Sequence, residues 1–172
     1  MMQNRRFLSY ILFVTGVALL FGAGLYYFHT REPVTSGQAK NVPEILANLP
    51  MVRIVTGQEA INLIHQLHGN DFSLKDGTVA TYGNQNATLW VSDAGSVSAA
   101  AKLTELMSDR ISAGNSPFSV LGDFELDGQT VHALDGMGQA HYYWQVRNMV
   151  IWLAVEVPVA QQAIIECVEF YK

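Results

Sequence analysis

An uninterrupted apolar run near the N-terminus constrains this chain more than any other feature. Residues 7–28 (FLSYILFVTGVALLFGAGLYYF) include no charged side chain. At about 1.5 Å per residue, a helix of this length spans roughly 33 Å, enough to cross the hydrocarbon core of a bilayer. A cleaved signal peptide is the alternative, but the run is long and no A-x-A cleavage site follows it cleanly. We therefore expect an uncleaved transmembrane helix over 7–28.

The charges that flank this run predict its orientation. Arg5 and Arg6 precede it, and no acidic residue occurs before Glu32. Positive residues stay on the cytoplasmic side, so residues 1–6 form a short cytoplasmic tail. The protein is then a single-pass protein of the cytoplasmic (inner) membrane, with its remaining residues in the periplasm or outside the cell. A tail of six residues is too short for a signalling or catalytic domain.

The predicted transmembrane helix also has a candidate contact with another helix. Ala18 and Gly22 are separated by three residues. Two small residues at this spacing let a neighbouring helix approach closely. We therefore expect the partner of this protein to be another membrane protein or complex.

Composition excludes several classes for the part that follows the apolar run. Residues 33–172 carry 7 Lys and Arg against 14 Asp and Glu, a net charge of −7. Nucleic-acid binding needs clustered positive charge, so nucleic acid is excluded as a partner. The single cysteine, Cys167, excludes an intramolecular disulfide and any multi-cysteine metal motif.

Turn-forming residues predict where the folded domain begins. Residues 29–49 contain a helix-breaking Pro33 and a turn-like Thr35-Ser36-Gly37-Gln38 segment, and we expect a linker there, with a short helix over 43–49. The extracytoplasmic domain then spans residues 50–172.

Local patterns after residue 50 predict short strands and amphipathic helices. Thr56-Gly57-Gln58-Glu59 is a capping box, in which the Thr and Glu side chains satisfy N–H groups at the start of a helix. Gly69 is a suitable residue to end that helix. A second helix is indicated by apolar residues at helical spacing over 100–111. Strands are predicted over 51–55, 78–83 and 87–92.

Three turns predict a four-stranded meander in the C-terminal half. Asp127-Gly128 is a two-residue hairpin sequence, 135–138 is predicted to be a four-residue turn, and Arg147-Asn148 is predicted to be another two-residue turn. Pro158 then opens a C-terminal helix, because Pro is favoured in the first helical turn. The predicted fold class is α+β, with a mainly antiparallel sheet packed by about three helices on one face. The strands of the meander are 119–126, 129–134, 139–146 and 149–156.

These turns also predict which residues lie opposite one another. They pair Asp123 with His132, and His132 with His141. Side chains alternate between the faces of a sheet, so the three residues form one row with neighbours about 5 Å apart. A carboxylate and two imidazoles could bind a divalent transition metal. The plainer alternative is a mixture of polar residues on an open sheet face.

The same face carries large side chains beside that row. Tyr143, Trp152 and Val150 lie there, accompanied by Glu125 and Thr130. An apolar patch on a solvated face typically meets a partner. These five residues are therefore the candidate partner-binding surface.

Two functions of different classes follow from these features. The first is a non-catalytic, membrane-anchored accessory or assembly subunit of a larger membrane complex, which binds through the second face of its sheet. The alternative is an extracytoplasmic protein that binds a metal, haem or small ligand through the row of Asp123, His132 and His141. No catalytic motif and no cofactor are predicted, although a divalent metal is compatible with the row.

Overall fold

The structure is a computed structural model that describes residues 41–68, 72–114 and 116–172. The expected transmembrane helix over 7–28, with Ala18 and Gly22, lies outside these residues. Within the described part of the chain, no helix combines the length and the apolar composition needed to cross a membrane.

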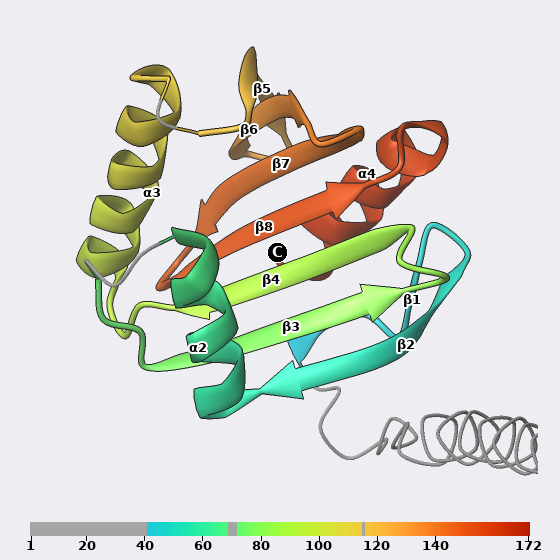
Figure 1. The fold of residues 1–172 in the computed structure, drawn as a ribbon, viewed down its shortest axis with the longest axis horizontal. Coiled ribbons are helices and arrows are strands. Elements are labelled where there is room, and N and C mark those ends of the chain that lie inside the picture. The colour runs from blue at the N-terminus through green and yellow to red at the C-terminus, as the bar shows by residue number, and fades with distance from the viewer. Residues whose placement is uncertain (1–40, 69–71, 115) are drawn as a thin grey trace, which may run out of the picture. The chain divides into compact units, whose positions relative to one another are not determined.

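The described residues form an antiparallel α+β domain built on an eight-stranded sheet (Figure 1). The strand order is β1-β2-β3-β4-β8-β7-β6-β5, so the C-terminal meander joins the N-terminal strands through the β4–β8 pair. The strands are β1 (Ile45–Leu46), β2 (Leu49–Thr56), β3 (Asp76–Tyr82), β4 (Ala87–Asp93), β5 (Ser119–Leu126), β6 (Gln129–Gly136), β7 (Gln139–Val146) and β8 (Met149–Val155).

Helices cover both faces of this sheet, and the expectation of helices on one face is wrong. Helices α2 (Gly57–His68) and α3 (Val97–Ser112) pack on one face, and α4 (Ala160–Phe170) follows the short 3-10 helix η2 (Val157–Val159) and packs on the other. Figure 1 shows α2 in front of the sheet and α4 behind it. The physical reason is that β8, a central strand, is buried on both of its sides, which a strand in a sheet with one solvated face is not.

The larger core lies between the sheet and α4. Trp144 and Leu153 are fully buried there, and they pack with Ile164 and Cys167 of the helix. Residues 41–49 also belong to this core, because Val42, Leu46 and Ala47 are buried in it. Residues 41–49 of the predicted linker are therefore part of the folded domain, and a two-residue strand, β1, replaces the predicted short helix over 43–49.

A second core lies under α3. The helix begins at an N-cap, Ser96, whose hydroxyl accepts a hydrogen bond from the Ala99 N–H at 3.1 Å. The helix then buries four residues at helical spacing against β6, β7 and β8. The residues of this core are Ala100, Leu103, Met107 and Ile111 of α3 with Leu134, Tyr143, Val150 and Trp152 of the sheet.

The turns of the meander are confirmed at two places and corrected at one. Asp127-Gly128 and Arg147-Asn148 are two-residue turns, as predicted. The predicted four-residue turn at 135–138 is instead a two-residue turn formed by Met137 and Gly138, both with positive φ. A turn of this type matches the twist of its strands, so β6 continues to Gly136.

Candidate functional site

The corrected turn shifts the pairing of β6 and β7 by two residues. His132 lies opposite Tyr143, and His141 lies opposite Leu134. A shift of two residues keeps every side chain on its predicted face but moves it along the strand. Asp123, His132 and His141 therefore share a face, as predicted, but they do not form one row.

The row that the structure contains is Asp123, His132, Tyr143, Trp152 and Trp90, each opposite the next on a neighbouring strand. We call it the cross-strand row. The His132 and Tyr143 rings are stacked with centroids 4.5 Å apart, and the Tyr143 and Trp152 rings are stacked at 5.4 Å. Stacked cross-strand rings stabilise the pairing of the strands that bear them.

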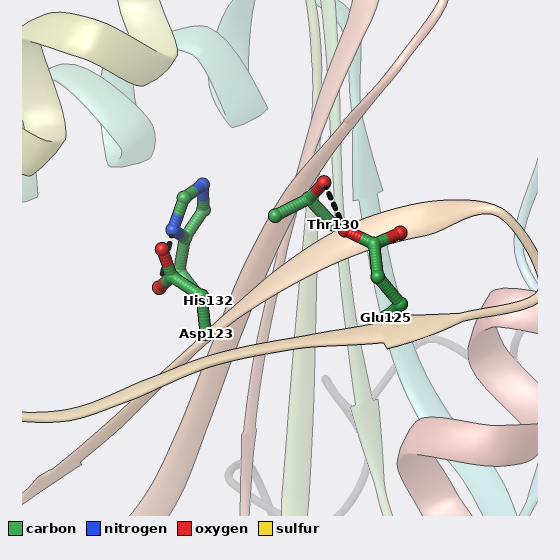
Figure 2. Close-up of polar contacts among 4 residues, drawn as sticks. All are labelled: Asp123, Glu125, Thr130 and His132. Atoms are coloured by element: carbon green, nitrogen blue, oxygen red, sulfur yellow. Dashed lines mark hydrogen bonds and ion pairs between the residues drawn. The ribbon is translucent and has the colours of Figure 1, made fainter.

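The outer end of this row is polar and partly exposed. His132 Nδ1 lies 2.8 Å from Asp123 Oδ1, and the two side chains are 22% and 56% exposed. Two residues further along, the Thr130 hydroxyl donates to Glu125 Oε1 at 2.6 Å. Figure 2 shows both pairs standing on the same side of the β5–β6 hairpin.

His141 has a different environment, because it is buried under Phe118 and Trp152. Its Nδ1 accepts a hydrogen bond from the Trp152 indole N–H at 3.2 Å, and its Nε2 lies 3.1 Å from the Gly136 carbonyl oxygen. Nε2 must therefore carry the proton, since a carbonyl only accepts. Burial lowers the pKa of His141, against smaller opposing effects of the Gly136 hydrogen bond and Asp135. His141 is a neutral core residue at neutral pH.

The predicted metal triad is therefore not assembled. The structure brings Asp123 and His132 together, but both ring nitrogens of His141 are already occupied by protein groups. Among the described residues, no group of three or more His, Cys, Asp or Glu side chains could hold a metal ion.

The predicted partner-binding surface is also rearranged. Tyr143, Val150 and Trp152 are buried under α3, and only Glu125 and Thr130 remain exposed. Burial raises the pKa of Tyr143, although a hydrogen bond with Ser108 of α3 opposes the shift. The apolar side chains that suggested an interface are thus the core beneath a helix.

An exposed strand edge, which was not predicted from the sequence, lies next to these residues. β5 is the last strand of the sheet, and nothing in the described chain pairs with its outer side (Figure 1). Val120, Leu121 and Phe124 are respectively 57%, 68% and 37% exposed on it. We call residues 119–126 the β5 edge. The sequence located the strand, but no local pattern shows that a strand is at the end of a sheet.

Comparisons with known proteins add little to this description. No protein-family model matches the sequence, and no curated protein matches it. A solved structure described as a GTP binding regulator from Thermotoga maritima is similar over 72% of this chain and 77% of its own, with 15% identity and a TM-score of 0.44. A likeness at this level supports no statement about function.

Proposed function

We propose that this protein is a non-catalytic, membrane-anchored accessory or assembly subunit of a larger membrane complex. In this proposal, the apolar segment over 7–28 anchors the chain, and the α+β domain stands on the outer side of the membrane. The domain contacts its partner through the β5 edge, instead of through the sheet face that the sequence suggested.

The exposed apolar residues of the β5 edge are the observation that supports this function. An edge strand presents unpaired N–H and C=O groups, and natural proteins protect such a strand with charged side chains, Pro, a bulge or a covering element. β5 (SVLGDFEL) has a bulge and two carboxylates but neither Lys nor Pro, and it still exposes three large apolar side chains. A partner that covers the strand would bury these side chains and pair its backbone.

Val120 and Leu121 provide the test of this function. The tagged full-length chain is purified from its native membranes in mild detergent, and stoichiometric membrane proteins are identified by mass spectrometry. Replacing both residues with Lys removes apolar contact area and adds charge to the strand. Losing about 1.5 kcal/mol from each of the two side chains, about 3 kcal/mol together, predicts that the partner binds roughly a hundred-fold more weakly.

The matched control makes the same change at exposed apolar residues elsewhere. Ile45 and Val157 are 62% and 65% exposed, and neither belongs to β5. Replacing both of these with Lys should leave the partner bound. The proposal is refuted if no stoichiometric membrane partner co-purifies, or if the β5 variant retains the partner as well as the control does.

A further inference from the structure

The backbone geometry of the β5–β6 hairpin determines which groups face its free edge. The turn residues Asp127 and Gly128 both have positive φ, 51° and 77°, so the hairpin has a two-residue loop. The residues that flank such a turn are hydrogen-bonded to each other, and bonded and non-bonded pairs then alternate along the strands. By this alternation, Asp123 and Glu125 direct their N–H and C=O groups away from β6.

The side chains of the same strand alternate in chemistry as well as in direction. Asp123 and Glu125 stand on the α3 side of the sheet beside His132 and Thr130 (Figure 2). Phe124 points to the opposite side, where its ring meets Tyr142 edge-on at 6.2 Å. A strand laid along this edge would therefore meet carboxylates on one of its faces and an apolar ring on the other.

The hairpin is also acidic. Residues 111–146 contain four carboxylates (Asp123, Glu125, Asp127 and Asp135) and no Lys or Arg. Lys172 pairs with Asp127 at 2.8 Å. Thr130 is a neutral donor, so its hydrogen bond leaves the charge of Glu125 uncompensated.

From these three observations we propose that the β5 edge binds an extended basic segment of a partner protein, which adds to the sheet as a further strand. The segment alternates Lys or Arg with apolar residues, so that cations lie beside Asp123 and Glu125 and apolar side chains lie beside Phe124. Such strand addition draws affinity from main-chain hydrogen bonds and specificity from alternate side chains. The inference rests on the proposed function and specifies which part of the partner meets the edge.

The length of the segment follows from the bulge in β5. The pairing with β6 is regular from Gly122 to Leu126 and shifts between Val120 and Gly122. A bulge bends its strand and disrupts the ladder. The bound segment therefore spans about five residues in regular pairing, which matches the modest length of ordinary strands.

A second copy of this chain does not fit the same edge. Antiparallel pairing of two β5 strands centred on Phe124 would set Asp123 of each copy opposite Glu125 of the other. Like charges directly opposite each other destabilise a strand pair. Charge therefore favours a basic partner over self-association.

The test uses the full-length chain in non-ionic detergent and three fluorescent probe peptides. The basic peptide is Lys-Val-Lys-Val-Lys-Val, the permuted peptide is Lys-Lys-Lys-Val-Val-Val, and the acidic peptide is Glu-Val-Glu-Val-Glu-Val. Fluorescence anisotropy should show the tightest binding for the alternating basic peptide, with weaker binding as salt is raised. The Asp123→Asn/Glu125→Gln variant should bind it about five-fold more weakly, as expected for the loss of two exposed ion pairs.

Two further variants control for net charge and for the sign of the charge at the β5 edge. Glu59→Gln/Glu169→Gln removes the same charge from exposed positions on α2 and α4, and it should bind the basic peptide as the parent chain does. Asp123→Lys/Glu125→Lys should reverse the preference and bind the acidic peptide instead.

Amide hydrogen exchange separates strand addition from simple charge attraction. The N–H groups of Asp123 and Glu125 should become protected when the basic peptide is added. The Phe124 N–H already bonds to β6 and should change much less. Charge attraction alone would leave all three exchange rates unchanged.

The inference is overturned by any of three results. These are equal binding of the alternating and permuted peptides, unchanged exchange at Asp123 and Glu125, or a dimer in detergent that the Val120→Lys/Leu121→Lys variant abolishes. If any of these three results appears, but the Val120→Lys/Leu121→Lys variant still loses its membrane partner, then the proposed function stands and only the basic strand is wrong. If no membrane partner co-purifies, the proposed function itself fails, whichever peptide binds.

Discussion

Replacing His141 with Leu, an apolar side chain of similar size, tests whether the buried histidine is a neutral structural residue. The change removes the acceptor of the Trp152 N–H, at 3.2 Å, and the donor to the Gly136 carbonyl, at 3.1 Å. Each hydrogen bond contributes about 1 kcal/mol net. The variant should therefore lose about 2 kcal/mol of unfolding free energy at pH 7.

The pH dependence of this loss tests whether His141 is neutral more directly than the size of the loss does. Burial lowers the pKa of His141 in the folded state, so below about pH 6.5 the unfolded chain binds a proton that the folded chain does not. Above that pH, the full contribution of His141 to the unfolding free energy is present. It decreases as the pH falls toward the folded pKa, by at most about 1.4 kcal/mol per pH unit. The difference between parent and variant should thus shrink as the solution is acidified.

The assay is urea unfolding of the full-length chain in mild detergent between pH 5 and 8, followed by tryptophan fluorescence. The control is His132→Leu, because His132 lies on the same face but pairs at the surface with Asp123, and its loss should cost below about 1 kcal/mol. His141 is not the structural residue described above if His141→Leu is as stable as the parent chain at pH 7. A difference between parent and variant that stays constant on acidification would likewise contradict a lowered pKa of His141.

Three further predictions follow from local geometry, each measurable on the full-length chain. Gly136→Ala should lower the unfolding free energy by about 1–3 kcal/mol, because its Cβ would lie 2.8 Å from the Pro117 carbonyl oxygen. Ser96→Ala should cost about 1 kcal/mol in the same urea titration, because it removes the acceptor of the Ala99 N–H at the start of α3, and Ser96→Thr should restore most of it. Cys167 should react with a thiol reagent only at the rate of unfolding, because burial raises the pKa of its thiol; fast labelling of the native chain would contradict its placement.

Much of the local structure could be predicted from the sequence, because its causes lie within a few residues. The capping box at Thr56 predicted the start of α2, and Asp127-Gly128 predicted both the turn and the pairing of Asp123 with His132. The turn after β6 was predicted with the wrong length, because Met137 adopts a positive φ that non-glycine residues seldom take. Asp123, His132 and His141 still share their predicted face, because a shift of two residues does not change the face of a side chain.

The candidate site depended on contacts between segments that are far apart in the chain. The shared face of Tyr143, Val150 and Trp152 could be predicted from the sequence, because strand alternation and the two-residue turn between their strands are local properties. Tertiary packing placed α3 over this face, which turned an expected interface into a core. It also packed Phe118 and Trp152 against His141, whose burial lowers its pKa. Strand order also depended on tertiary contacts. β4 pairs with β8, although α3 and β5 to β7 separate them in the sequence, and β5 is therefore the exposed edge of the sheet. Helix packing and sheet order reflect the burial of apolar area by the whole domain, which no short stretch of sequence encodes.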